Sequence, residues 1–175
     1  MCRRCLGLTI RTKKRQFSTE DCRFFIRVLL QVKYIQMNSE KDNDIPYLLS
    51  IYKLPEILRF IGIDEKNYFS YVINTENVFY FKVYKNEHLV ATVHCELDDK
   101  VLYIGLMVIP KYQNLGIGTE ILSDIQNGVL ALPFTHIKVS IDKLNIFSLR
   151  LFDKMNFVKT SEDEDLIDFI WNNKV

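Results

Sequence analysis

Three strand-like segments follow one another in the middle of the chain, and they constrain the fold more than any other feature. Residues 77–85, 88–97 and 100–109 are rich in β-branched and aromatic residues, and polar residues bound each segment. Two residues, "NE" and then "DD", separate each segment from the next, and both connectors suit β-hairpins. The sequence therefore predicts three consecutive antiparallel strands.

The residues before these strands have helical character. Residues 45–62 are predicted to form two short helices separated near Pro55, because proline is tolerated in the first turn of a helix but not in its interior. Residues 64–74 place aromatic and aliphatic side chains at helical spacing, and Asp64 is the predicted cap of that helix.

The remainder of the chain alternates helices with strands. Apolar residues at helical spacing predict one helix from residue 117 to about residue 130 and another within residues 142–157. Residues 133–141 alternate β-branched with other side chains, as in a strand, and residues 157–162 and 165–173 predict two last strands. This order of elements predicts an α+β fold around one mixed sheet.

Charge divides the chain into two regions. Residues 1–36 carry nine Lys or Arg against two acidic residues, whereas residues 37–175 carry fourteen against twenty. We expect residues 1–36 to be a basic extension outside the fold and residues 37–175 to be a single domain with a hydrophobic core. One alternative is a functional chain that begins at Met37, and another is that residues 24–35 pack as a strand or helix. A targeting segment or a nucleic-acid-binding arm in the extension is a further alternative, although we expect no nucleic-acid partner.

Other classes of protein and site find little support in the sequence. No apolar run reaches the roughly 18–20 residues that span a bilayer, so we expect no membrane partner. The Cys2-x-x-Cys5 pair has no second pair and no histidine nearby, and His88, His94 and His136 lack ligand spacing, so we expect no metal. Nothing indicates disulfides or export, and a cytoplasmic location is expected.

Two glycines lie one residue apart between the predicted strand at 100–109 and the helix that follows. Gly116 and Gly118 permit positive φ and remove side chains from the inner side of this turn. The start of the helix offers free N–H groups, so the amides of residues 114–119 and the Thr119 hydroxyl could converge on a pyrophosphate. The spacing matches neither common nucleotide-binding fingerprint. The alternative is that the glycines only allow close packing of strand and helix.

Two motifs of the chain resemble those of the GNAT superfamily of N-acetyltransferases. In "VIPKYQNLGIGTEIL", Gln113, Gly116 and Gly118 fill the defining positions of the acetyl-CoA-binding signature. About thirty residues later, "NIFSLRLFDKMNF" resembles the second motif of the family. The matching residues of that motif are Asn145, Ser148, Leu151, Lys154 and Phe157. The element order also fits from about residue 45 onward.

This resemblance implies a GNAT-like fold, with helices on both faces of the sheet and a splayed strand pair that holds acetyl-CoA. It implies transfer of an acetyl group from acetyl-CoA to a primary amine, by direct attack in a ternary complex and without a metal. The acceptor, a small molecule or a protein amine, stays open. The sequence does not give the oligomeric state, and a homodimer is one alternative because dimers are common in the superfamily. The alternative is a non-catalytic acyl-CoA-binding module that acts as a sensor or interaction protein.

The resemblance also implies roles for particular residues. Backbone groups at the end of the 100–109 strand would pair with the pantetheine arm, and one N–H would polarise the thioester carbonyl. Asn145 would lie beside the cofactor, with a plain helix cap as the alternative. The residues assigned to the cofactor are Leu106, Met107, Val108, Gln113, Asn114, Leu115, Gly116, Ile117, Gly118, Thr119 and Asn145.

The sequence identifies the general acid and the general base less clearly than the cofactor-binding residues. Many family members carry a tyrosine where this chain has Phe152, which has no proton to give and is expected to pack in the core. Alternation along the 88–97 strand places His94 and Glu96 on one face; Glu96 is the first candidate for the general base and His94 the second. Each could instead be a solvated strand residue. Ser140 and Asp142 are weaker candidates for contact with the acceptor.

Four further residues complete the expectations. Asn156 stands where the family usually has glycine, and asparagine tolerates the left-handed conformation that ends a helix. Tyr68, Tyr71 and Tyr103 are candidates for the acceptor pocket, with core packing as the alternative.

Overall fold

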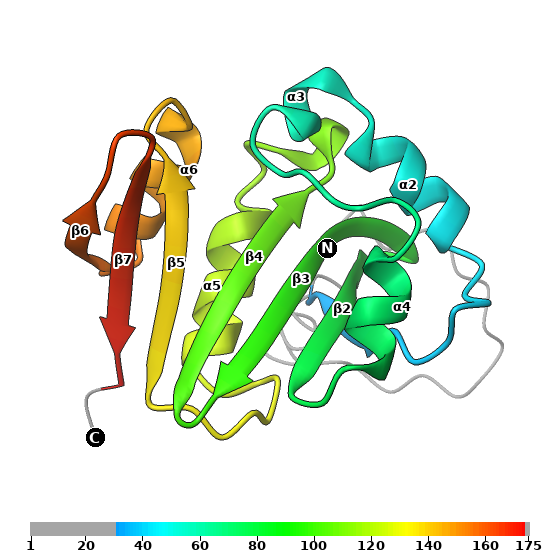
Figure 1. Cartoon of the computed structure of the whole chain (residues 1–175), viewed down its shortest axis with the longest axis horizontal. Coiled ribbons are helices and arrows are strands. Elements are labelled where there is room, and N and C mark those ends of the chain that lie inside the picture. The colour runs from blue at the N-terminus through cyan, green and yellow to red at the C-terminus, as the bar shows by residue number, and fades with distance from the viewer. Residues whose placement is uncertain (1–30, 174–175) are drawn as a thin grey trace, which may run out of the picture. The chain divides into compact units, whose positions relative to one another are not determined.

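The computed structural model describes residues 31–173 of the chain (Figure 1). These residues form a seven-stranded mixed sheet in the order β1-β2-β3-β4-β5-β7-β6. The strands are β1 (Lys33–Gln36), β2 (Val78–Lys85), β3 (His88–Asp98), β4 (Val101–Val108), β5 (His136–Asp142), β6 (Val158–Glu162) and β7 (Leu166–Asn172).

Strands β2, β3 and β4 form the antiparallel meander that the hairpin connectors predict. Asn86 and Glu87 at the first connector and Asp99 at the second have positive φ, the conformation of tight hairpin turns. This pairing fixes which side chains share a face, because residues directly opposite each other point to the same side of a sheet. His94, for example, lies opposite Gly105.

Strands β4 and β5 run parallel but separate along their length. They pair only over Val101–Tyr103 and His136–Lys138. Beyond Tyr103 they diverge toward their carboxyl ends, as Figure 1 shows, while β5 stays paired with β7 over its full length. The sheet therefore contains the splayed strand pair that the resemblance implies.

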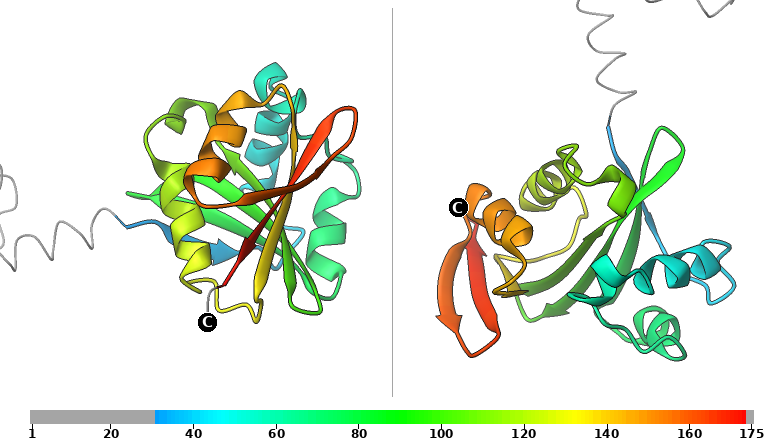
Figure 2. Two further views of the ribbon diagram at one scale, coloured as in Figure 1. Left: turned by 90° about the vertical axis from the view of Figure 1, so that its left-hand side faces the viewer. Right: turned by 90° about the horizontal axis from the view of Figure 1, so that it is seen from above.

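Helices cover both faces of the sheet, as the view from above in Figure 2 shows. They are α2 (Ile45–Tyr52), α3 (Pro55–Leu58), α4 (Tyr68–Asn74), α5 (Ile117–Gln126) and α6 (Ile146–Lys154), with a 3-10 turn η1 (Pro110–Tyr112). Side chains of α5 and α6 pack in one hydrophobic core, and those of α2, α3 and α4 pack in a second core on the opposite face.

Three expectations about boundaries need correction. Residues 33–36 form β1 at the edge of the sheet, paired with β2, so the fold begins before Met37. Helix α5 ends at Gln126 rather than near residue 130, because Gly128 takes a positive φ in the turn that follows. Helix α4 begins at Tyr68, and the Asp64 carboxylate instead accepts bonds from the turn before it. The predictions for residues 1–30 lie outside the described residues.

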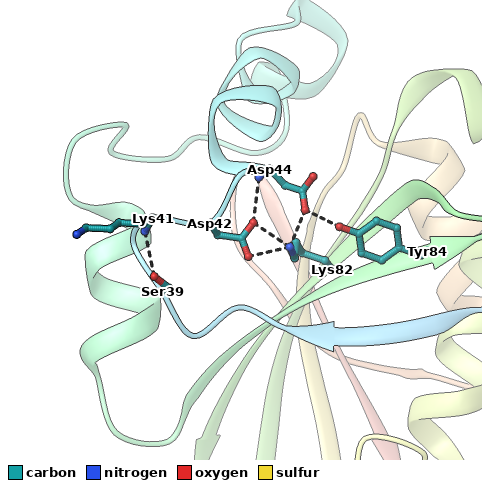
Figure 3. A network of polar contacts seen from close by, with 6 residues as sticks. All are labelled: Ser39, Lys41, Asp42, Asp44, Lys82 and Tyr84. Atoms are coloured by element: carbon teal, nitrogen blue, oxygen red, sulfur yellow. Dashed lines mark hydrogen bonds and ion pairs between the residues drawn. The ribbon is translucent and has the colours of Figure 1, made fainter.

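A buried lysine ties the segment before α2 to the sheet (Figure 3). The ammonium of Lys82 on β2 donates to both carboxylate oxygens of Asp42, at 2.8 and 2.7 Å, and to Asp44 at 2.6 Å. The hydroxyl of Tyr84 also donates to Asp44. Burial alone would lower the pKa of Lys82, but its hydrogen bonds to the two aspartates outweigh burial and raise the pKa above its usual value.

Among residues 31–173, no helix combines the length and the apolar composition needed to cross a membrane.

Candidate active site

Two cavities meet where β4 ends. The first, of about 530 Å³, lies among the end of β4, η1, the first turn of α5 and one side of α6. The second, of about 410 Å³, lies between β4 and β5 on the side of α2 and α4. The residues that line both are Phe60, Ile61, Leu106, Met107, Asn145, Ser148 and Phe152. A molecule in the first cavity can therefore contact one in the second.

The two glycines of the turn have different physical roles. Gly116 has φ of 79°, a conformation that other residues rarely adopt, and open space surrounds the position that a Cβ would take. A Cβ on Gly118 would instead lie 2.9 Å from a methyl group of Leu151, so this glycine allows α6 to pack closely against α5. Close packing of the two helices therefore explains Gly118, whereas Gly116 supplies the left-handed conformation of the turn and leaves its inner side open.

The turn presents a series of unpaired amides to the first cavity. Within the described part of the chain, the N–H groups of residues 114–119 find no acceptor, and the first helical bond runs from Glu120 to Gly116. These amides lie at the positive end of the α5 dipole. The Gln113 side chain donates to the carbonyl of Val108 at 3.0 Å and so holds the loop to the end of β4. Such a row of donors suits a phosphate or pyrophosphate.

Most residues assigned to the cofactor from the sequence line this first cavity. They are Leu106, Met107, Val108, Gln113, Asn114, Gly116, Ile117, Gly118, Thr119 and Asn145. Leu115 does not line this cavity, and the residue is 67% exposed, so only its backbone amide can contact a ligand there.

The motif at the start of α6 has a structural role that the sequence left open. The side-chain Oδ1 of Asn145 accepts a hydrogen bond from the Ser148 backbone amide at 3.1 Å, so Asn145 caps the helix. Asn145 also lines both cavities. Phe152 is buried and packs edge-on against Phe157, with ring centroids 4.9 Å apart, so its predicted core role is confirmed. Asn156 has φ of 62°, as expected for the residue that replaces glycine.

Positive side chains border the first cavity. Arg59 after α3 and Arg150 and Lys154 on α6 all line it, against the single carboxylate of Glu56. Net positive charge beside a row of free amides favours an anionic ligand with several phosphates. Arg59 and Arg150 were missed from the sequence, because no motif links their side chains to a cavity that only the folded chain forms.

The second cavity brings together groups from distant parts of the chain. His94 on β3, Ser140 and Asp142 on β5, and Tyr68 on α4 all line it. Gly105 on β4 lines it too, and its missing side chain leaves room beside His94. Glu96, Tyr71 and Tyr103 do not line this cavity.

His94 is held between two partners. Its Nδ1 lies 2.8 Å from the hydroxyl of Tyr68, and its Nε2 lies 3.1 Å from a carboxylate oxygen of Glu96. The same carboxylate oxygen accepts a hydrogen bond from the Tyr71 hydroxyl at 2.9 Å. Burial lowers the pKa of His94, although Glu96 opposes this effect, so the imidazole is neutral near pH 7. Of the two predicted bases, His94 lines the second cavity, whereas Glu96 does not line it and contacts the imidazole of His94.

A sheet with a splayed parallel pair, a glycine turn of free amides and a second cavity at the same strand end defines the class of acyl-CoA-dependent acyltransferases. Residues 42–157 match the acetyltransferase (GNAT) family, so the chain belongs to this family and is an acetyltransferase-class enzyme. No curated protein sequence matches the chain significantly.

Solved structures support the fold. The N-acetyltransferase PseH of Campylobacter jejuni, in complex with acetyl coenzyme A, aligns over 82% of this chain and 99% of its own, with a TM-score of 0.67 and 17% identity. The spermidine N-acetyltransferase of Vibrio cholerae, in complex with CoA and spermine, covers 82% and 96%, with a TM-score of 0.68 and 13% identity. The aminoglycoside acetyltransferase AAC(6')-Ib, in complex with coenzyme A, gives the same coverage and TM-score at 15% identity.

Proposed function

We propose that the protein transfers an acetyl group from acetyl-CoA to a primary amine by direct attack in a ternary complex. The observation that carries this proposal is the meeting of the two cavities at Leu106 and Met107, with the free amides of the glycine turn on one side and His94 on the other. Acetyl-CoA occupies the first cavity and the amine the second. The thioester carbon then lies at their junction, where both substrates are within reach.

Each part of acetyl-CoA has matching groups in the first cavity. The amides of residues 114–119 hold the pyrophosphate, supported by Arg150 and Lys154. Among the described residues, strand β4 has no partner on the β5 side beyond Tyr103, so backbone groups of Leu106 to Val108 pair with the pantetheine arm like an added strand. One of these N–H groups polarises the thioester carbonyl, a contribution of about 3 kcal/mol to the barrier in comparable sites.

Direct attack is favoured over an acyl-enzyme because the one cysteine among residues 31–173 is not placed to act as a nucleophile. Cys95 is fully buried in the core on the other face of β3, and burial raises the pKa of its thiol to about 12. A thiol with this pKa is not ionised near pH 7 and is a poor nucleophile.

The acceptor is a primary amine of a small molecule or a protein. Two structural neighbours are acetyltransferases for amines, an aminoglycoside in one and spermidine in the other. The carboxylate of Asp142 at the second cavity suits a cationic amine.

The test is release of free CoA thiol from acetyl-CoA with a panel of amines that includes polyamines, aminoglycosides, amino acids and lysine peptides. Acetyl-CoA affinity is measured in parallel by calorimetry. Turnover with at least one amine supports the proposal. Tight acetyl-CoA binding without turnover on the whole panel supports the alternative, a non-catalytic acyl-CoA-binding module.

Filling the second cavity should affect only the acceptor. A Cβ at Gly105 would lie 3.7 Å from the Cβ of His94, an ordinary contact, so Gly105→Ala should fold normally. We expect Gly105→Leu, which extends into the space for the amine, to raise the KM for the amine at least tenfold. The affinity for acetyl-CoA should stay within twofold for both variants. A Gly105→Leu enzyme with unchanged KM for the amine would show that the acceptor binds elsewhere.

A further inference from the structure

The contacts of His94 leave neither ring nitrogen open to the second cavity. Nδ1 is taken by the hydroxyl of Tyr68, and Nε2 is buried against Glu96. The Nε2–H direction is not aligned on the carboxylate well enough for a hydrogen bond, so this contact is electrostatic. A proton from an amine in the cavity can therefore reach a ring nitrogen only through one of these two partners, of which Tyr68 lines the cavity and Glu96 does not.

The neighbours of His94 determine which nitrogen carries the proton. A proton on Nε2 faces the negative oxygen of Glu96, whereas a lone pair on Nε2 would be repelled by it. We assign the neutral ring to the Nε2–H form on this basis. Nδ1 then has a free lone pair, and the Tyr68 hydroxyl donates to it. This leaves the oxygen lone pairs of Tyr68 to accept a proton from the cavity.

We propose that Tyr68 is the residue that touches the acceptor amine and relays its proton to His94. This inference rests on the proposed function. One proton of the bound ammonium passes to the Tyr68 oxygen as the Tyr68 O–H proton passes to Nδ1 of His94. The product of this step is a neutral amine beside the thioester and an imidazolium whose Nε2–H faces Glu96.

The remaining steps of the reaction need no general acid from the protein. The amine lone pair forms the C–N bond and gives a tetrahedral intermediate. The C–S bond then breaks, its electron pair leaves on sulfur, and the second proton of the attacking nitrogen passes to that sulfur. His94 returns its proton to solvent. Phe152, which has no proton to offer, is compatible with this sequence of steps.

The environment of the two side chains suits a relay rather than a resident base. Burial raises the pKa of Tyr68, and the neighbouring Tyr52 adds to this effect, so the phenol is neutral at rest. Tyr68 can therefore accept a proton only as it gives up its own. The ionisable groups that face His94 are Tyr52 from α2, Tyr68 and Tyr71 from α4, Tyr80 from β2, Glu96 from β3 and, across the cavity, Asp142 from β5.

The first test compares tyrosine variants with the amine that the wild-type enzyme acetylates fastest. We expect Tyr68→Phe to lower kcat by about 100-fold or more, the usual contribution of a positioned acid–base group, with the affinity for acetyl-CoA unchanged. The control Tyr47→Phe removes an exposed hydroxyl on α2 that makes no hydrogen bond to Tyr68, His94 or Glu96, and it should leave kcat unchanged. A folded Tyr68→Phe enzyme with kcat within twofold of wild type would overturn the relay.

The dependence of kcat on pH separates the relay from a merely structural role of Tyr68. In the wild type, kcat should fall as pH drops below the pKa of His94, which lies under the ordinary value of about 6.5. Glu96 raises that pKa, so Glu96→Gln should move this fall in kcat, the acid limb of the pH profile, to lower pH. His94→Gln should abolish the limb. A limb that stays in place in both variants would contradict the role of His94 as proton acceptor.

A third measurement needs no turnover. Nitrogen chemical shifts of the His94 ring, assigned with the His94→Gln variant, report which nitrogen is protonated in the neutral enzyme. The relay requires the proton on Nε2, and a proton on Nδ1 would overturn it. If the wild-type enzyme acetylates no amine, the proposed function fails, and this measurement still decides whether the geometry for the relay exists.

Discussion

Substitution of Gly116 by valine should weaken binding of acetyl-CoA by at least 100-fold. A valine at this position places a branched side chain in open space directly beside the free amides of the turn. It also disfavours the φ of 79°, which costs roughly 1–2 kcal/mol for a residue with a Cβ. Calorimetry with acetyl-CoA and with CoA measures the effect.

Gly128 provides a matched control for this substitution. It has φ of 75°, nothing lies within 4 Å of the position of its Cβ, and it follows the other end of α5. Gly128→Val therefore carries a similar backbone cost without a side chain at the cofactor cavity. We expect similar losses of thermal stability in the two variants and normal acetyl-CoA affinity only for Gly128→Val. Normal affinity in a folded Gly116→Val protein would show that the pyrophosphate lies elsewhere.

This comparison also separates two explanations of a glycine pair that no sequence pattern distinguishes. The spacing of Gly116 and Gly118 predicts a turn, but the reason for each glycine depends on what faces it. Gly118 faces Leu151 of α6, more than thirty residues later in the chain, and Gly116 faces open space. Residues so far apart in sequence are brought together only by the packing of α5 and α6.

The fold could be predicted largely because its signals are local. Alternating side chains and two-residue connectors predict the meander, and Asn145 followed by apolar residues at helical spacing predicts α6. Strand β1 was not placed in the expected fold because it spans only four residues, most of them exposed, and its partners on β2, such as Tyr84 opposite Lys33, lie far along the chain. A short edge strand of this kind has no pattern of its own to detect.

The acceptor side of the site could be predicted only in part. Alternation along the strand correctly predicted that His94 and Glu96 share one face of the sheet. Which of the two side chains borders the second cavity depends on the residues that cover that face. Helix α4 brings Tyr68 onto Nδ1 and Tyr71 onto Glu96, and it thereby leaves His94 nearer the cavity. No spacing in the sequence relates residues 68 and 94, because the contact joins helix α4 to strand β3, and strand β2 lies between them in the chain.

Removal of the buried cation at Lys82 should have the largest effect on stability. Lys82→Met would leave the carboxylates of Asp42 and Asp44 close together without the ammonium that now bridges them. Breaking a buried ion pair from one side costs about 3–5 kcal/mol. Because the two carboxylates are 17% and 31% exposed and can gain water, we expect a loss of about 2–3 kcal/mol, or about 5–10 °C in Tm.

The control for this variant is Lys53→Met, which removes the cation of an exposed pair with Glu65, where the two side chains are 59% and 49% exposed. Such pairs contribute about 0–1 kcal/mol. Similar melting of the Lys82→Met and Lys53→Met proteins would show that the buried cluster does not stabilise the fold.

Acid should remove the difference between wild type and Lys82→Met. Burial alone would raise the pKa of Asp44, but its hydrogen bonds from Lys82 and Tyr84 outweigh burial and lower this pKa below the unfolded value of about 3.9. A lowered folded pKa gives stability that is present above the unfolded pKa and is lost as pH falls through the folded pKa. Urea unfolding at pH 7 and near pH 3 should therefore show a large difference between the two proteins at pH 7 and a smaller one at pH 3. An equal difference at both values would mean that lost packing of the lysine side chain, rather than charge, accounts for the effect.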